Sequence, residues 1–563
     1  KKKRAVKKKS AQSKQPTPAV IYTQPQAFNR NRLLVQLLTV VGKKLIHLDL
    51  EELAFRHSSQ YKENPITSHT YVDGKGVITF QEALTSIPED GFVNCNKLKT
   101  IILPPRVKSL GRQAFSGCNY LTSIQLSDDL ESIGEAALNS FSRMDSLFIP
   151  AKVSHIASNA FEHTNNLKYI AVDKDNKYFD TREDCNALIE TATNTLLRGS
   201  SDSVIPSTVT ALGDYAFSMA AFKTLDIPDN ITSIGTGAFK HCLLLEEINL
   251  PEGLAEIGDE AFYGCSKLLE IKVPEKVSRI GRSAFSSCRL LKEISLPESV
   301  AEIGEAAFHS CQELTEIALS DKITVIPDYI FSYCYNLCKV EISKNITTIG
   351  TNAFSYCEKL SEITLPESVT RIEGGAFRGT AIKTITIPSK VRKLSNQVFQ
   401  NCNSLESIIL SEGLEFINSD CIGSTRLAEI TIPATIQEIS YRAFVGCPEL
   451  KSVYIKAITP PKHPNNYLFG SANDLENRKE QFIKIIVLDF KTENPIANIE
   501  GKSTGGSCNL SGTSNMRRTA SCTVAVDKYG IDGQQYYNIT DINNLISMNK
   551  KVRIETGFTE LHQ

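Results

Sequence analysis

The 563-residue sequence contains no tryptophan and only four methionines. It also lacks net charge, since 62 lysines and arginines face 63 aspartates and glutamates, which gives a formal charge of −1. Without tryptophan, tyrosine and arginine are the side chains left to anchor a binding partner. Without a basic excess, nucleic acid is not expected as the partner of the whole chain.

The sequence has no run of 18 apolar residues, so no segment is expected to span a membrane. The first apolar stretch, LLVQLLTVV at residues 33–41, follows the basic start KKKRAVKKKSAQSKQ and resembles the opening of a membrane anchor or a signal sequence. It is too short for an anchor and lacks the small-residue cleavage site of a signal peptide. Two interpretations of residues 31–70 stay open: a helical segment packed near the first coil, or a degenerate export or anchor segment. Membrane contact is expected only through this N-terminal part.

The motifs of common enzymes are missing too. The nine histidines are scattered, and neither HExxH nor GxSxG occurs. No convergent set of titratable residues can be assembled into an active site. We therefore expect no enzymatic activity, no cofactor and no metal site.

What the sequence does contain is one phrase repeated fifteen times, as in LLEIKVPEKVSRIGRSAFSSC at residues 268–288. Most steps between repeats are 23 residues long. The phrase starts at Leu98, Leu121, Met144, Leu167, Phe222, Leu245, Leu268, Leu291, Leu314, Leu337, Leu360, Ile382, Leu405, Leu427 and Leu450. A fixed period between 20 and 29 residues is typical of a leucine-rich solenoid, in which each unit buries its apolar face against its neighbours.

The residues inside one repeat indicate its local structure. Ile271 and Val273 alternate with polar residues, which predicts a strand with these two side chains inward. Pro274 ends that strand, Gly281 allows a tight backbone turn, and Phe285 is expected inside a one-turn helical element. The pattern predicts an α/β fold that is mainly β. The expected architecture is a right-handed leucine-rich-repeat solenoid of about fifteen coils of 22–23 residues, with one parallel sheet and short helical turns.

Two positions of the repeat predict a buried column each. A phenylalanine recurs at Phe115, Phe161, Phe217, Phe239, Phe262, Phe285, Phe308, Phe331, Phe354, Phe377, Phe399 and Phe444. A cysteine follows three residues later at Cys118, Cys242, Cys265, Cys288, Cys311, Cys334, Cys357, Cys402 and Cys447. Because this cysteine ladder has no CxxC pair and its side chains would run parallel, we interpret the cysteines as small buried apolar residues rather than metal ligands or disulfides.

The combination LxxIxLPxxVxxIGxxAFxxC resembles the BspA-like leucine-rich repeats, over roughly residues 71–490. The resemblance implies a non-enzymatic recognition protein at the cell surface or secreted, which adheres to a protein or a glycan. Because no clear signal peptide or C-terminal anchoring module is recognised, a cytoplasmic location stays open. The alternative function is a structural or scaffold protein targeted by its basic N-terminus.

The domain organisation follows from these segments. Residues 1–30 are expected to be a disordered basic tail, 31–70 the uncertain segment above, and 71–490 the solenoid with its caps. A hairpin at 71–80 and a strand at 483–490 would cap the two ends. An insertion at about 171–205, with a small hairpin near Asn194, interrupts the repeats. Residues 491–563 form a linker and a small C-terminal module, or a disordered tail. We expect the protein to be a monomer.

Two candidate binding regions remain. The first is a row of outward strand residues, mostly glutamate: Glu247, Glu270, Lys272, Glu293, Glu316, Lys339 and Glu362. Like charges stacked at the ~5 Å strand spacing repel one another, and the functional interpretation is that the row attracts a cationic partner surface or divalent ions. Partial neutralisation by Lys272, Arg279, Lys292 and Arg371 favours the other interpretation, a solvated mixed face. The second region is the insertion, where Tyr178 and Arg182 are side chains of the kind that anchor partners.

Overall fold

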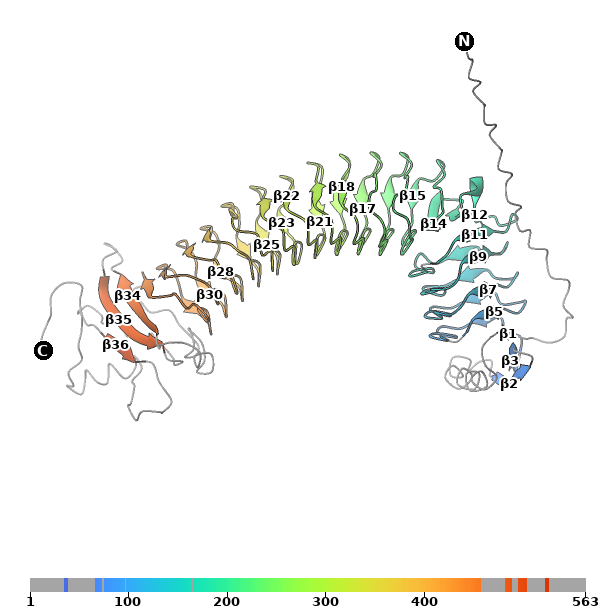
Figure 1. Ribbon diagram of the computed structural model, residues 1–563, viewed down its shortest axis with the longest axis horizontal. Helices are drawn as coiled ribbons and strands as arrows, with labels where there is room; N and C mark the ends of the chain where they lie inside the picture. The colour runs from blue at the N-terminus through green and yellow to red at the C-terminus, as the bar shows by residue number, and fades with distance from the viewer. Residues whose placement is uncertain are drawn as a thin grey trace, which may run out of the picture.

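The computed structural model describes residues 80–456, apart from Lys97 and Asn165, and the backbone of six further strand segments near the two ends. Within these residues the chain is almost all strand and turn and contains no α-helix, forming a parallel solenoid of about 16 turns. Figure 1 shows the coils stacked side by side in an arch. The predicted solenoid is therefore confirmed, with a coil at Leu84–Cys95 added before the first repeat that the sequence pattern identified.

The first strand row contains the leucine-rich strands of most coils. Its strands are β5 (Thr100–Ile102), β7 (Ser123–Gln125), β9 (Ser146–Ile149), β11 (Tyr169–Val172), β18 (Glu270–Lys272), β20 (Glu293–Ser295), β22 (Glu316–Ala318), β24 (Lys339–Glu341), β27 (Thr384–Thr386), β29 (Ser407–Ile409), β31 (Glu429–Ile432) and β33 (Ser452–Ile455). Neighbours pair in parallel, as Ile271 does with Ile294. Alternate residues point inward and outward, so that Ile271 is buried between exposed Glu270 and Lys272.

A second strand row follows the proline loop of each coil. Its strands are β4 (Ser86–Ile87), β6 (Ser109–Leu110), β8 (Ser132–Ile133), β10 (His155–Ile156), β15 (Ala211–Leu212), β16 (Ser233–Ile234), β17 (Glu256–Ile257), β19 (Arg279–Ile280), β21 (Glu302–Ile303), β23 (Val325–Ile326), β25 (Thr348–Ile349), β26 (Arg371–Ile372), β28 (Lys393–Leu394), β30 (Phe416–Ile417) and β32 (Glu438–Ile439). These two-residue strands also pair in parallel. The structure thus contains two rows of parallel strands, divided into several short sheets, where the sequence predicted one sheet.

The third side of each coil is the segment around the phenylalanine, which was expected to be a helical turn. In the structure it is a series of tight turns, because Ser283 and Ser287 adopt left-handed φ angles of 53° and 62° that interrupt any helix. The amides of Ser283, Phe285 and Ser287 donate to carbonyl oxygens of the next coil at 2.7–2.8 Å, while the amides between them bond locally. This turn ladder is a third set of hydrogen bonds between coils.

The glycine before this segment allows adjacent coils to approach closely. A Cβ atom added to Gly281 would lie 2.4 Å from the backbone nitrogen of Asp259 in the preceding coil. The predicted need for glycine is confirmed, and its cause is the neighbouring backbone.

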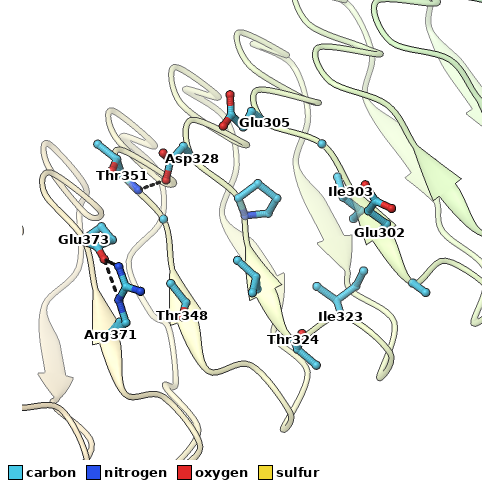
Figure 2. A pocket seen from close by; sticks show the side chains of 15 residues that line it. Glu302, Ile303, Glu305, Ile323, Thr324, Asp328, Thr348, Thr351, Arg371 and Glu373 are labelled. Atoms are coloured by element: carbon cyan, nitrogen blue, oxygen red, sulfur yellow. Dashed lines mark hydrogen bonds and ion pairs between the residues drawn. The ribbon is translucent and has the colours of Figure 1, made fainter.

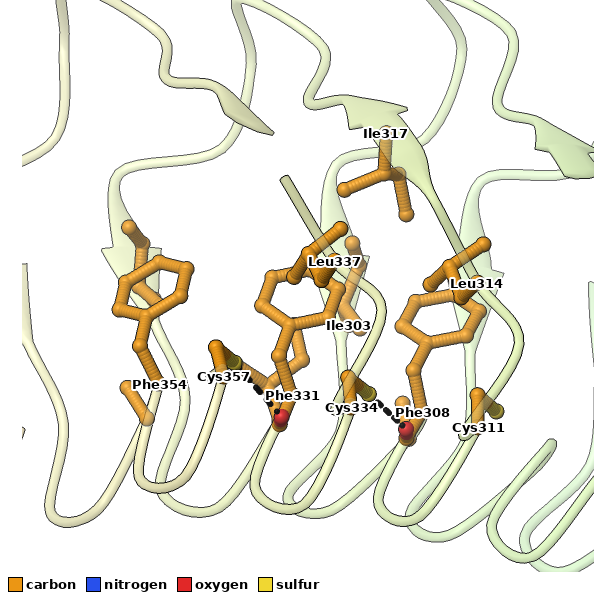
Figure 3. Packing of buried hydrophobic residues seen from close by; sticks show 14 of the residues in the cluster. Ile303, Phe308, Cys311, Leu314, Ile317, Phe331, Cys334, Leu337, Phe354 and Cys357 are labelled. Carbon is orange, nitrogen blue, oxygen red and sulfur yellow. Dashed lines mark hydrogen bonds between the residues drawn. The ribbon is translucent and has the colours of Figure 1, made fainter. Parts of the chain in front are cut away.

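The phenylalanines form the predicted aromatic column. Phe262, Phe285 and Phe308 are fully buried, and consecutive rings stack nearly parallel with centroids 5.4 and 5.6 Å apart. Figure 3 shows the same arrangement continuing through Phe331 and Phe354. Each ring therefore packs on the coil before it and the coil after it, which couples the stability of neighbouring coils.

The cysteine ladder runs beside this column. The Sγ atom of Cys288 donates to the carbonyl oxygen of Phe262 at 3.2 Å, and Cys311 donates to Phe285 at 3.1 Å. Every described ladder cysteine is buried and none is in a disulfide. Burial raises the pKa of the Cys334 thiol to about 12. Cysteine fits this place because it is small, apolar and still donates one weak hydrogen bond.

The insertion contains β12 (Phe179–Asp180), a short 3-10 turn at Arg182–Asp184, β13 (Ala187–Glu190) and β14 (Thr195–Gly199). The antiparallel pairing of β13 with β14 confirms the predicted hairpin near Asn194. The hairpin is built into the stack, because β14 pairs in parallel with β15 and Ile189 is fully buried. Figure 1 shows the stack of coils turning here, near β12 and β14. The buried apolar residues divide into two clusters at this hairpin.

One buried arginine connects the two groups of coils across the insertion. Arg198 of β14 is 2% exposed, and its guanidinium donates to the carbonyl oxygens of Thr164, Tyr215 and Ser218. Thr164 belongs to the last coil before the insertion, and the other two belong to the first coil after it. Burial lowers the pKa of Arg198 to about 10. The three acceptors offset the cost of burying this cation without a carboxylate partner.

Strands at both ends extend the sheets. β1 (Val35–Leu38) pairs antiparallel with β5 and with β3 (Lys75–Phe80), which forms the predicted hairpin with β2 (Ile66–Val72). At the other end β34 (Gln481–Leu488) pairs in parallel with β33, followed by β35 (Pro495–Ser503) and β36 (Cys522–Ala525). These pairings cover the edges of the first and last coils. The backbone N–H and C=O groups at such edges would otherwise be exposed without strand partners.

The helix considered for residues 31–70 is wrong for the segments described there. Residues 35–38 form a strand because this apolar segment, rich in leucine and valine, pairs with the open edge of the first coil at β5. Residues 66–70 form a strand because they pair with β3 in the hairpin. The expected basic tail at 1–30 and most of the segment at 491–563 lie outside the described residues.

Candidate binding surface

The outward residues of the first strand row form the largest regular surface that the sequence predicted as a site. Strand register places Glu270 beside Glu293, and Glu316 beside Lys339. All these side chains are exposed, because they alternate with buried isoleucine or valine along each strand. Glu247 and Glu362 occupy the same repeat position in their coils and are also exposed. The structure therefore brings the predicted row together on one face.

We call this row of outward residues the acidic row: Glu247, Glu270, Lys272, Glu293, Glu316, Lys339 and Glu362. Few ion pairs form along it. Lys339 lies 2.7 Å from Glu341 and 4.0 Å from Glu316, and its hydrogen bond to Glu341 raises the pKa of the lysine. Lys272 lies 3.6 Å from Glu252 of the preceding proline loop. Among the described residues, no ion pair or side-chain hydrogen bond joins a partner to the carboxylates of Glu247, Glu270, Glu293 and Glu362.

Two arginines that were expected to neutralise the row do not contact it. Arg279 lies 2.9 Å from Asp259 and 3.5 Å from Glu302, and Arg371 pairs with Glu373. These arginines belong to the second strand row, which faces a different side of the coil. The repeat spacing alone did not show that these arginines and the acidic row lie on different sides of the coil.

Charge on the first strand row changes along the solenoid. Before the insertion the outward residues carry no charge: Thr100, Ile102, Ser123, Gln125, Ser146, Phe148, Tyr169 and Ala171. From Asp226 to Glu362, the equivalent positions hold seven carboxylates and two lysines. The carboxylates of this central section are Asp226, Glu247, Glu270, Glu293, Glu316, Glu341 and Glu362. The acidic surface is thus concentrated in the middle of the molecule, and in the described strands after it Glu429 is the one carboxylate at an equivalent position.

The insertion presents only one of its two predicted residues. Tyr178 is 51% exposed. Arg182 is bound inside the insertion, with Nε 2.9 Å from Asp180 and Nη1 2.7 Å from Asn194, which lies in the turn of the hairpin. Arg182 therefore holds the hairpin in shape, and Tyr178 is the side chain available to a partner.

A cavity of about 690 Å³ opens on the second strand row, where small residues lie between larger ones (Figure 2). Val325 and Thr348, which are neighbours in β23 and β25, line it together with Glu302 and Arg371. Its polar groups largely contact one another: Asp328 accepts a hydrogen bond from the backbone of Thr351 at 2.6 Å, and Arg371 pairs with Glu373.

In the described part of the chain, no group of three or more histidine, cysteine, aspartate or glutamate side chains is placed to hold a metal ion. In the same residues no helix has the length and apolar character needed to cross a bilayer.

The parallel coils, with their leucine-rich strands and buried phenylalanine column, define a leucine-rich-repeat solenoid. The sequence matches the family described as BspA type leucine rich repeat region in six copies, over residues 75–186, 210–338 and 324–451. These residues make up more than half of the chain, so the protein belongs to this family. Its members are typically surface proteins that mediate protein interactions, and their repeats act as non-enzymatic binding scaffolds.

Solved structures of bacterial leucine-rich-repeat proteins resemble the chain at low identity. One from Eubacterium ventriosum is 24% identical over 54% of this chain and 82% of its own, with a TM-score of 0.41. One from Bacteroides ovatus is 23% identical over 68% and 84%, with a TM-score of 0.37. A leucine rich cell surface protein from Faecalibacterium prausnitzii is 22% identical over 58% and 76%, with a TM-score of 0.25. A comparison with curated proteins gave no match.

Proposed function

We propose that the protein is a non-enzymatic adhesin of the cell surface or the secreted fraction, which binds a basic surface of another protein through its acidic row. The observation that supports this most directly is the line of exposed carboxylates, Glu247, Glu270 and Glu293, that have no cationic partner in the described residues. Stacked like charges are unfavourable for folding and raise the local attraction for a cationic partner.

The test is a variant in which Glu247, Glu270, Glu293 and Glu316 are all changed to glutamine. A lysine-rich peptide of alternating glycine and lysine is the probe, titrated at several salt concentrations. We expect affinity to fall roughly tenfold or more, since each exposed ion pair contributes about 0.2–1 kcal/mol. The remaining binding should depend less on salt, because fewer charges are left to be screened.

A charge-matched control uses the proline loops of the same repeat region. Changing Glu252, Glu275, Glu298 and Glu367 to glutamine removes the same charge from exposed positions on another edge. This control should retain most of the peptide binding and its salt dependence. Equal losses in both variants would mean that net charge, and not the acidic row, attracts the probe.

The cellular location is tested separately. Protease applied to intact cells should cleave a surface protein, whereas a purely cytosolic fraction would contradict the adhesin and favour the scaffold alternative. A glycan array tests whether a carbohydrate takes the place of the protein partner.

A further inference from the structure

Two residues in nearly every coil have left-handed backbone, one two positions before the core phenylalanine and one two positions after it. They include Ser283, Ser287, Ala306, Ser310, Asn352, Gly375, Gly379, Gln397 and Asn401. A left-handed φ is unfavourable for residues with a Cβ atom and is an outlier for bulky ones. Most coils accordingly use small or polar residues at these positions.

Three of these positions in adjacent coils are tyrosines instead. Tyr329, Tyr333 and Tyr356 have φ angles of 56°, 62° and 60°. Ser310 and Gly379 occupy the equivalent position in the flanking coils, so the fold itself does not require tyrosine. Unfavourable backbone conformations tend to be retained where they serve a function.

Tyr333 and Tyr356 form a cluster with Tyr335 and with one residue from the coil on either side. The rings of Tyr333 and Tyr356 stack with centroids 5.2 Å apart, and Tyr335 meets Tyr333 edge-on at 6.1 Å. His309 packs edge-on against Tyr333 from the preceding coil at 5.6 Å. The guanidinium of Arg378 lies 5.6 Å from the ring of Tyr356. We call these residues, together with Tyr329, the tyrosine cluster.

The glycine of the following coil makes room for this cluster. A Cβ atom on Gly379 would lie 2.8 Å from Cδ1 of Tyr356. The ring of Tyr356 therefore lies across the next coil, in a space that serine or asparagine at residue 379 would reduce.

Three tyrosines of the cluster are exposed, whereas Tyr356 and Arg378 are half-buried and the Nε atom of Arg378 is enclosed without a hydrogen-bond partner. Tyr329, Tyr333 and Tyr335 are 44%, 39% and 36% exposed. None of the four tyrosine hydroxyls has a hydrogen-bond partner among the described residues, and the guanidinium of Arg378 has neither an ion pair nor a hydrogen bond there. By contrast Arg279, which is also on the surface, contacts three carboxylates.

We propose that the tyrosine cluster is a second interaction surface, which binds an acidic segment of another protein. Tyrosine and arginine are the residues most often found at the energetic centre of protein interfaces. Arg378 is the ionised group of the cluster without a counter-charge, and its guanidinium is suited to a carboxylate. The rings of Tyr333 and Tyr356 stack on each other, which leaves their hydroxyls to donate hydrogen bonds to a carboxylate. This surface acts independently of the acidic row, which attracts the opposite charge.

The test replaces the tyrosines with the residues that neighbouring coils use at the same positions. The triple variant Tyr329→Ala, Tyr333→Ser and Tyr356→Ser should leave the melting temperature nearly unchanged, because alanine and serine occupy the equivalent left-handed positions at Ala306 and Ser310. The same variant should bind a peptide of alternating glycine and glutamate at least tenfold more weakly in titration calorimetry. A fall in melting temperature with unchanged binding would overturn the proposal, because the tyrosines would then serve packing alone.

Two further variants separate the charge from the rings. Arg378→Gln should weaken binding of the glutamate peptide, and Arg378→Lys should recover part of it. As a control, Tyr120→Ser removes an exposed tyrosine that also lies under an arginine, Arg143, at 4.2 Å, and should leave binding unchanged. Failure of the native protein to bind the glutamate peptide would also overturn the proposal. The triple variant should bind the lysine peptide normally, so failure here is distinguishable from failure of the acidic row.

Discussion

The coils before the insertion and the coils after it share one cross-section but differ in how regularly it is filled. In the later coils the phenylalanine column is unbroken from Phe217 to Phe399. In the earlier coils Leu138 replaces the phenylalanine, and Phe141 replaces the cysteine three residues later. Both are fully buried. The exchange keeps a large and a smaller side chain in the same space, so the interior requires total volume more than a particular order of residues.

The largest effect should come from interrupting the regular column. Phe308→Ala should lower the free energy of unfolding by ~3–5 kcal/mol, because it removes a ring stacked on two neighbours. Phe308→Leu, which copies the one earlier coil that has Leu138 at this position, should cost less. Urea denaturation measures both values, and hydrogen exchange should show loss of protection in the adjacent coils. A loss below about 1 kcal/mol for alanine would contradict the proposed coupling.

Arg198→Met should have the next largest effect, since it acts where the two groups of coils meet. Three carbonyl oxygens would lose a charged donor, and a hydrogen bond to a charged group contributes about 1.5–3 kcal/mol. We expect a loss of about 2–3 kcal/mol and a melting curve that separates into two transitions. The matched change Arg392→Met at an exposed ion pair should cost less than about 0.5 kcal/mol. A single unaltered transition in the Arg198 variant would show that the insertion does not depend on this residue.

Thiol labelling should distinguish the two environments of cysteine. In a variant with Cys508→Ser and Cys522→Ser, only exposed Cys338 should react with a thiol reagent while the protein is folded. The raised pKa of buried thiols such as Cys334 keeps them protonated and unreactive. Cys288→Ala should cost about 1 kcal/mol through its lost packing and its hydrogen bond. Rapid labelling of several thiols would show that the coils open readily.

The smallest effect we expect is a dependence on pH at the insertion. Burial lowers the pKa of His163 and of His241, whose rings are 6.4 Å apart, and nearby Lys240 adds to the shift. Because the unfolded chain binds protons more readily, this stability is complete above about pH 6.5 and is lost as the pH falls through the lower folded pKa values. The free energy of unfolding should therefore be lower at pH 5.5 than at pH 7.5. Changing both histidines to asparagine should reduce this difference. Asparagine is suitable because Asn401 occupies the equivalent position in another coil.

The regular part of this architecture could be predicted because each coil repeats the same requirement for burial. Leucine and phenylalanine spacing identified the coils, and Cys288 was correctly assigned as a buried apolar residue. The helical turn at Phe285 was wrong, because serine in left-handed backbone carries no distinctive sequence signal. The coil at Phe92 was missed because its residues at the glycine position and at the strand positions differ from those of the other repeats.

The surface was less predictable than the interior. The line of Glu270 and Glu293 followed from the repeat, because strand register fixes which residues are neighbours. The placement of Arg279 and Arg371 did not, since it depends on which side of the coil each short strand faces. The tyrosine cluster escaped notice because Tyr333 and Tyr356 lie in turns, where no periodic pattern distinguishes outward residues. Their departure from serine and glycine at the equivalent positions was the available signal.

The turn ladder also has a mechanical consequence. Its hydrogen bonds, like those of both strand rows, join one coil to the next along the long axis of the solenoid. A force that pulls the two ends apart would load these bonds in tension, so that coils peel away one at a time instead of shearing together. Each 23-residue coil would release about 80 Å of extended chain. Under load the molecule would therefore lengthen in equal steps, with one coil released at each step.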